Sequence, residues 1–142
     1  MASINWIRVL LGGLAAGFVM NCGEFVLNAV IFAKDIEESN RKLNLPPPSG
    51  DFIAKAVILV FLVGIVAVLL YAAIRPRFGA GPKTAILAGF IIWFLVFVYG
   101  SVLNNAMGIF PLNLTLIGLA WALVEAPLAT LVGAWVYREE AA

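Results

Sequence analysis

Residues 56–74 read AVILVFLVGIVAVLLYAAI, an apolar run that contains no polar side chain before Tyr71. A helix that crosses the hydrocarbon core of a bilayer needs roughly 20 predominantly apolar residues. This run therefore predicts a membrane-spanning helix. Gly64 breaks the surface of that helix near its middle, and we expect it to form a notch for a neighbouring helix.

The composition of the whole chain supports the same class. Of the 142 residues, 63% are hydrophobic and 12% are charged, and the mean hydropathy is +1.04. Soluble domains are about 45–50% apolar and about 25% charged. The sequence therefore predicts a multi-pass membrane protein with a single transmembrane domain over residues 1–142. Its net charge of +1 predicts no nucleic-acid partner.

Four segments are long enough to span a bilayer, at about residues 9–33, 52–74, 84–110 and 112–137. Residues 34–51 form the extramembrane loop between the first two. The first run is too long for the apolar core of a signal peptide, so we interpret it as a span. Because short connections force neighbouring helices to be antiparallel, the predicted fold is an all-α four-helix transmembrane bundle. Its topology is up-down-up-down, with both termini on the same side.

Prolines and charged residues predict where the helices begin and end. Asp51 follows three prolines and is placed to cap the second helix. That helix is expected to end at Arg75, because Pro76 cannot continue it, and Pro82 suits the first turn of the third helix. The connection between these two helices carries three basic residues and no acid. This bias places both termini in the cytoplasm.

The first predicted helix carries a polar stripe. Residues spaced by three and four positions lie on one helix face, and at this spacing stand Gly13, Gly17, Asn21, Glu24 and Asn28. The two glycines form a pair that lets another helix approach closely, and the two asparagines flank the carboxyl group of Glu24. Lipid would leave these polar groups without partners, so this face is predicted to look into protein or into a wet cavity.

A matching stripe lies on the fourth predicted helix. Gly118, Ala122 and Gly133 share a face with Glu125, and we predict that these small residues pack against another helix. Glu125 lies near the middle of its span. At about 1.5 Å rise per residue, Glu24 lies within a few ångströms of the same depth.

The candidate site consists of Asn21, Glu24, Asn28, Asn104 and Glu125, which are expected to form an intramembrane polar network or to bind an ion or ligand. Two carboxyl groups at similar depth are not comfortably both ionised, so at least one is expected to be protonated at neutral pH. Three interpretations stay open. The network fixes the register of the helices, it marks a path for protons or ions or binds a ligand, or one acid faces a partner subunit.

The sequence gives little indication of a metal, cofactor or catalytic site. The chain has no histidine and a single cysteine, Cys22, so it predicts no metal site and no cofactor, although contact with a lipid or pigment stays open. It contains no nucleophile paired with a base, no phosphate-binding loop and no dinucleotide fingerprint. We therefore expect no catalytic residue and no enzymatic activity.

The stretches LLGGLAAGFVMNCGEFVLNA (10–29), YAAIRPRFGAGPKTAILAG (71–89) and LVEAPLATLVGAWVYRE (123–139) resemble small, uncharacterised four-span proteins of the bacterial inner membrane. The resemblance implies that location and no activity. The first predicted function is an accessory or structural subunit of a larger membrane complex, for example photosynthetic or respiratory, or a self-associating bundle. Its partners would be lipids and other membrane subunits. The alternative is an oligomeric proton-coupled transporter or channel lined by Glu24, Glu125 and the asparagines.

Overall fold

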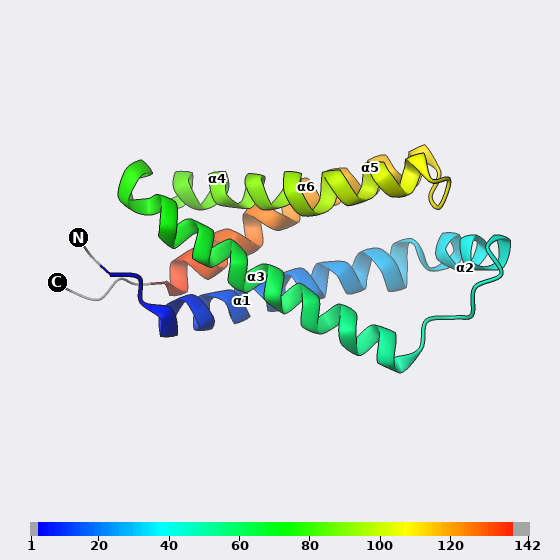
Figure 1. Ribbon diagram of the computed structural model, residues 1–142, viewed down its shortest axis with the longest axis horizontal. Helices are drawn as coiled ribbons and strands as arrows, with labels where there is room; N and C mark the ends of the chain where they lie inside the picture. The colour runs from blue at the N-terminus through cyan, green and yellow to red at the C-terminus, as the bar shows by residue number, and fades with distance from the viewer. Residues whose placement is uncertain (1–2, 138–142) are drawn as a thin grey trace.

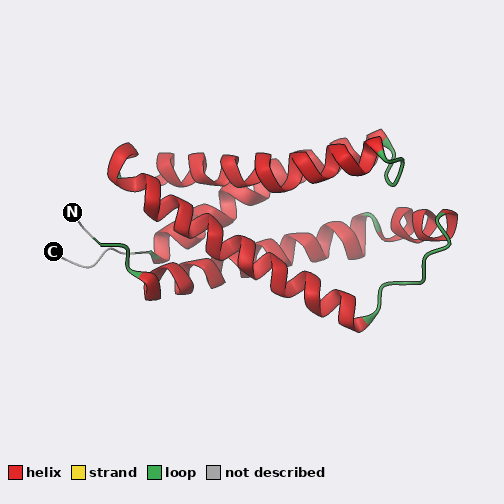
Figure 2. Ribbon diagram, viewed as in Figure 1, coloured by secondary structure: helices red, strands yellow, loops and turns green. Residues whose placement is uncertain are grey.

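The computed structural model describes residues 3–137, and over this range it consists of helices joined by short loops (Figures 1 and 2). In chain order they are α1 (Trp6–Phe25), the π-helical segment η1 (Val26–Ile31), α2 (Ala33–Lys42), α3 (Gly50–Phe78), α4 (Pro82–Ile92), the π-helical segment η2 (Trp93–Val98), α5 (Tyr99–Ala106) and α6 (Leu112–Val136). Four continuous helical stretches are long and apolar enough to cross a membrane: Trp6–Ile31, Gly50–Phe78, Pro82–Ala106 and Leu112–Val136. The protein is therefore an all-α four-helix transmembrane bundle, as predicted.

The helices run up and down in sequence. The beginning of α1, the connection between α3 and α4, and the end of α6 lie at one end of the bundle, which we call the termini end (Figure 1). α2 and the turn between α5 and α6 lie at the other, the α2 end. α1 packs against α3 and α6, and α4 packs against the same two helices. At the α2 end, η1 makes its principal contacts with its chain neighbours α1 and α2, while η2 and α5 pack against α6.

Two boundaries of the second span differ from the prediction. Ser49, and not Asp51, caps α3, because the helix begins at Gly50 and the Phe52 N–H donates to Ser49 Oγ at 3.2 Å. At the other end α3 continues through Pro76 to Phe78. A proline in the final turn removes only one of the helix's last hydrogen bonds, so the helix tolerates it. Pro82 stands in the first turn of α4, as the sequence predicted.

The first and third spans contain irregularities that the sequence did not predict. Each changes from α-helix to a single π-helical segment, η1 or η2. After η1 the chain turns at Phe32, and the charged helix α2 follows outside the span. The third span ends at Ala106, before the predicted 110, because Gly108 adopts φ 75° in a tight turn. Asn105 closes this turn by donating from Nδ2 to the Phe110 carbonyl at 2.9 Å.

Glycines allow α1 and α3 to approach closely. A Cβ atom at Gly64 would lie 2.6 Å from the carbonyl oxygen of Gly13 and 2.7 Å from the Cα of Gly17. No real side chain fits at such distances, so the two backbones are in direct contact. The notch expected at Gly64 thus receives the glycine pair of α1.

α6 makes its own close contacts near the termini end. A Cβ at Gly133 would lie 2.7 Å from the Gly12 carbonyl oxygen on α1 and would also collide with Val68 on α3. Gly89 on α4 lies directly against the backbone of Pro127. Gly118 does not lie in such a contact, because a Cβ there would meet only a ring carbon of Phe32, at 3.8 Å. The close packing of α6 is therefore confined to the half of the helix nearer the termini end.

Candidate functional site

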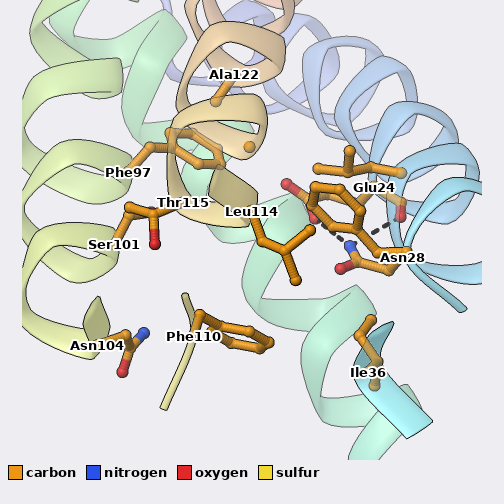
Figure 3. Close-up of a pocket in the computed structure, with 13 residues that line it drawn as sticks. Glu24, Asn28, Ile36, Phe97, Ser101, Asn104, Phe110, Leu114, Thr115 and Ala122 are labelled. Atoms are coloured by element: carbon orange, nitrogen blue, oxygen red, sulfur yellow. Dashed lines mark hydrogen bonds between the residues drawn. The ribbon is translucent and has the colours of Figure 1, made fainter. Parts of the chain in front are cut away.

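A cleft of about 170 Å³ opens where the bundle is loosely packed, at the α2 end. One wall comes from the end of α1, η1 and the start of α2, and the other comes from η2, α5 and α6. Figure 3 shows Glu24 and Asn28 on the first wall facing Phe97, Ser101 and Asn104 across the cleft. The cleft runs from the level of Ala122, inside the bundle, to Ile36 and Phe110 beyond it.

Glu24 is the acid that lines the cleft. The Nδ2 group of Asn28, one turn further along, donates to Glu24 Oε2 at 2.7 Å and to the Glu24 carbonyl at 2.9 Å (Figure 3). The amide therefore fixes the position of the carboxyl group. Oε2 of Glu24 accepts this hydrogen bond, whereas Oε1 accepts none from the side chains and backbone of residues 3–137 and is available to a ligand.

Glu125 lies deeper and is 7% exposed. Its carboxyl group rests against Gly23 of α1, where a Cβ would collide with it, and lies within electrostatic range of Glu24. Neither carboxyl oxygen has a hydrogen-bond partner among residues 3–137. The indole of Trp121, one turn earlier on α6, lies close to the carboxyl, but its N–H does not reach hydrogen-bonding geometry. A buried carboxyl with no donor is stable only in its neutral form or with a ligand.

No basic side chain neutralises the two acids. Within the described residues the ion pairs are Glu38 with Lys42 on α2 and Asp51 with Lys55 in the first two turns of α3. Lys42 holds the pKa of the exposed Glu38 carboxyl below its usual value through a hydrogen bond and its charge. The segments 9–33, 56–74 and 84–137 contain no lysine or arginine at all. Nor does any group of three His, Cys, Asp or Glu side chains among residues 3–137 lie close enough to hold a metal ion.

The rest of the cleft is largely apolar and aromatic. Phe32, Phe97 and Phe110 contribute rings to its walls. Polar groups come from Ser101 and Thr115, and the Thr115 hydroxyl already donates to the Pro111 carbonyl at 3.1 Å. The site thus combines acids at its inner end with apolar walls toward its mouth.

Both π-helical segments border this cleft. η1 contributes Leu27 and Asn28, and η2 contributes Phe97. π-helical turns are rare and frequently mark functional sites, because they redirect side chains and weaken the regular hydrogen-bond ladder. Their presence on opposite walls of one cleft is a backbone feature that packing of apolar helices does not require.

The termini end of the bundle is closed instead. Val68, Ala126 and Ala129 are fully or almost fully buried between the helices. Beyond them the rings of Tyr71 and Tyr137 meet edge to face at 6.0 Å, and the Arg75 guanidinium lies 5.8 Å from the centre of the Tyr137 ring. The acids are therefore approached from the α2 end.

The structure brings together four of the five polar residues predicted from the sequence. Glu24, Asn28 and Asn104 line the cleft, and Glu125 lies beside its inner end. Asn21 is not part of the cleft, because its Nδ2 donates to the carbonyl of Gly17 at 2.9 Å and to that of Val57 on α3 at 3.4 Å. It joins α1 to α3.

Several residues of the site were missed or misassigned. Gly118, predicted to pack against another helix, lines the cleft wall instead, whereas Ala122 lines the cleft and is also buried, at 2% exposed. Gly23, which makes room for Glu125, lies outside the predicted stripe. Phe32, Phe97 and Phe110 gave no signal in the sequence, because aromatic residues are common throughout the third span and in lipid-facing positions. Only their convergence in three dimensions identifies them.

Comparison of the chain with protein-family models, with curated proteins and with solved structures finds no match.

Proposed function

We propose that this integral membrane protein is a proton-coupled transporter, in which the cleft receives a solute from the α2 end and Glu125 carries the exchangeable proton. The observation that carries the proposal is the Glu125 carboxyl, which is 7% exposed, beside Glu24, and without a hydrogen-bond partner among the described residues. Ionisable groups inside a membrane are costly and mark ion or proton pathways by default.

A purely structural role for the two acids explains the geometry less well. A polar clasp that fixed the register of the helices would satisfy its buried groups, because an unsatisfied carboxyl costs stability. Asn28 gives its hydrogen bonds to Glu24, and Asn21 gives its own to α1 and α3. Glu125 receives a hydrogen bond from neither asparagine. Its free oxygens fit a group that must gain and lose a proton.

The cleft and the closed end define the two sides of such a cycle. In the present arrangement Glu125 lies buried next to Glu24, which lines the cleft at the α2 end, while packed side chains separate Glu125 from the termini end. Release to the other side requires a second arrangement of the helices. η1 and η2 are the expected points of bending, since helices kink at π-helical turns.

The location predicted for the chain completes the proposal. In a bacterial inner membrane with both termini in the cytoplasm, the cleft opens to the periplasm. The role of accessory or structural subunit, the other function predicted from the sequence, accounts for the apolar outer faces of the helices. It gives no reason for a cleft lined by Glu24 with the buried Glu125 beside it, and the site therefore favours transport.

Proton flux into proteoliposomes tests this function. The purified chain is reconstituted with a pH-sensitive dye inside, and flux is followed under an imposed membrane potential and under gradients of amines, amino acids and monovalent metal ions. We expect the wild-type protein to move protons under at least one of these gradients. Glu125→Gln should reduce the flux to that of protein-free liposomes. Glu38→Gln, which removes an exposed acid on α2, should leave it unchanged. Wild-type flux equal to that of empty liposomes under every gradient would refute the proposal.

A further inference from the structure

We infer that the cleft binds a small organic cation, with its positive charge at Glu24 and its apolar part against the phenylalanine rings. The inference rests on the proposed function for the coupling to protons, but the binding itself follows from the charge, the shape and the lining of the cleft.

The charge of the ligand follows from the balance of acidic and basic side chains around the cleft. Glu24 faces the cleft with its carboxyl oriented by Asn28, and no lysine or arginine lies in segments 9–33, 56–74 or 84–137. A carboxylate in a place of low dielectric constant attracts a cation strongly, because little water screens the interaction. An anionic ligand would be repelled by the Glu24 carboxylate and would find no basic side chain in these segments.

The apolar part of the ligand follows from the walls. Phe32, Phe97 and Phe110 line the same cleft as Glu24, and Figure 3 shows Phe97 and Phe110 among its walls. Aromatic faces attract cations, especially alkylated ammonium groups that are poorly hydrated. They also cover hydrocarbon groups well. A bare metal ion would find one carboxyl and a few amide and hydroxyl oxygens here, which is fewer than hard cations require.

The size of the ligand follows from the volume. An apolar protein cavity of about 150 Å³ holds a benzene molecule, and the cleft measures about 170 Å³ and is open at one end. It therefore has room for one ring or a short branched chain carrying an ammonium group. A larger ligand would extend past Ile36 and Phe110 out of the mouth.

Binding is coupled to the proton on Glu125. The titratable group that acts on Glu125 from a neighbouring element is Glu24 on α1. Of the other charged or titratable side chains on the described helices that pack against α6, Tyr71 is buried in the packing at the termini end, and the rest lie toward helix ends or on outer surfaces: Arg8, Cys22, Asp51, Lys55, Arg75, Arg77, Lys83 and Tyr99. A cation seated at Glu24 cancels the charge that Glu24 presents to Glu125. The Glu125 O–H bond then breaks, its proton leaves to water at the α2 end, and one cation replaces one proton.

Calorimetric titration of the full chain in mild detergent tests the inference. The probes are benzyltrimethylammonium, a quaternary cation with one ring, and benzyl alcohol, which carries the ring without the charge. We expect wild-type protein to bind the cation. Glu24→Gln keeps the hydrogen bond from Asn28 but removes the charge, and should weaken cation binding by about tenfold or more. The same variant should leave any binding of benzyl alcohol unchanged.

A matched pair on η2 tests the aromatic wall. Phe97 lines the cleft, whereas Phe94 lies on the same segment and is 60% exposed on the outer surface. Phe97→Leu should weaken benzyltrimethylammonium binding by about threefold or more, as the loss of one cation–aromatic contact implies. Phe94→Leu should bind as the wild type does. Absence of cation binding to the wild type overturns the inference. Equal affinity of the wild type and Glu24→Gln also overturns it, since the binding signal would then come from partition of the probe into detergent.

The same titration separates this inference from the proposed function. Repeating it in buffers of different ionisation enthalpy gives the number of protons released on binding. We expect release by the wild type and binding without release by Glu125→Gln. Binding that Glu24→Gln abolishes, with no proton release and no flux in proteoliposomes, would uphold the cation site and refute proton-coupled transport. Proton flux without cation binding would uphold proton-coupled transport and refute the cation site.

Discussion

Gly23 on α1 and Glu125 on α6 lie in direct contact, so that the Glu125 carboxyl occupies the space where any other residue at position 23 would place its Cβ. Gly23→Ala must therefore displace the carboxyl group. Because the carboxyl is the movable end of a flexible side chain, we expect a loss of stability below about 1 kcal/mol. The surroundings of the protonated Glu125 carboxyl should change much more than the stability does. The carbonyl band of the protonated acid in infrared difference spectra should shift in Gly23→Ala and disappear in Glu125→Gln.

Gly100 provides the control for this substitution. It also lies in a helix, and a Cβ there would meet nothing within 4 Å. Gly100→Ala should change neither the infrared band nor the stability by more than the small gain in helix propensity. An unshifted band in Gly23→Ala would show that the two helices do not hold the carboxyl as described.

The two glycines of the predicted α6 stripe should respond in opposite ways to alanine. At Gly133 the added methyl group meets Val68 and the Gly12 backbone, and backbone cannot move without shifting a helix. Gly133→Ala is expected to destabilise the protein by about 1–3 kcal/mol. At Gly118 the methyl group meets only Phe32, at 3.8 Å, so Gly118→Ala should be neutral or stabilising by up to about 1 kcal/mol. Thermal unfolding in detergent micelles measures both, and equal destabilisation would contradict the packing described here.

The contrast between Gly133 and Gly118 shows which contacts can be predicted from the sequence and which cannot. The number of spans, the antiparallel order and the close approach at Gly64 follow from apolar length, short connections and small residues, which are local properties. The first part of the predicted stripe on α1, Gly13, Gly17 and Asn21, meets α3. Gly12 and Gly23, which lie outside the stripe, meet α6. Helical periodicity identifies a buried face but does not say which partner covers each part of it.

The cleft itself could not be derived from periodicity. Asn28 meets Glu24 one turn away, as helical spacing predicts, but the two π-helical segments that carry Asn28 and Phe97 into the cleft wall are not given by that spacing. No residue in VLNAVI or WFLVFV marks such a segment. The two acids were found because charge in an apolar run is conspicuous, whereas the aromatic walls became visible only when two separate helices were placed opposite each other.

The two asparagines of α1 should have separable effects. Asn28 donates to the Glu24 carboxyl, and Asn21 donates to carbonyls of α1 and α3. Asn28→Ala removes the donor that orients Glu24, and we expect benzyltrimethylammonium binding to weaken by about threefold to tenfold with little change in stability. Asn21→Ala should leave binding intact and lower stability by about 0.5–1.5 kcal/mol. Calorimetric titration and thermal unfolding of both variants check this, and an unchanged affinity in Asn28→Ala would count against Glu24 as the cation anchor.

Cysteine labelling from each side of the membrane should show where the cleft opens. In a Cys22→Ser background, which removes the single native cysteine, Ser101→Cys places a thiol in the cleft. A charged, membrane-impermeant thiol reagent should modify it from the side of α2 only, and benzyltrimethylammonium should slow the reaction. Tyr99 lies two residues away, is 71% exposed and lies beside the apolar outer face. A thiol in Tyr99→Cys should react slowly, because a thiolate is disfavoured in lipid. Reaction of Ser101→Cys in right-side-out vesicles would place the α2 end outside and both termini in the cytoplasm. Reaction at equal rates from both sides would show that the packing around Val68 and Ala129 does not close the bundle.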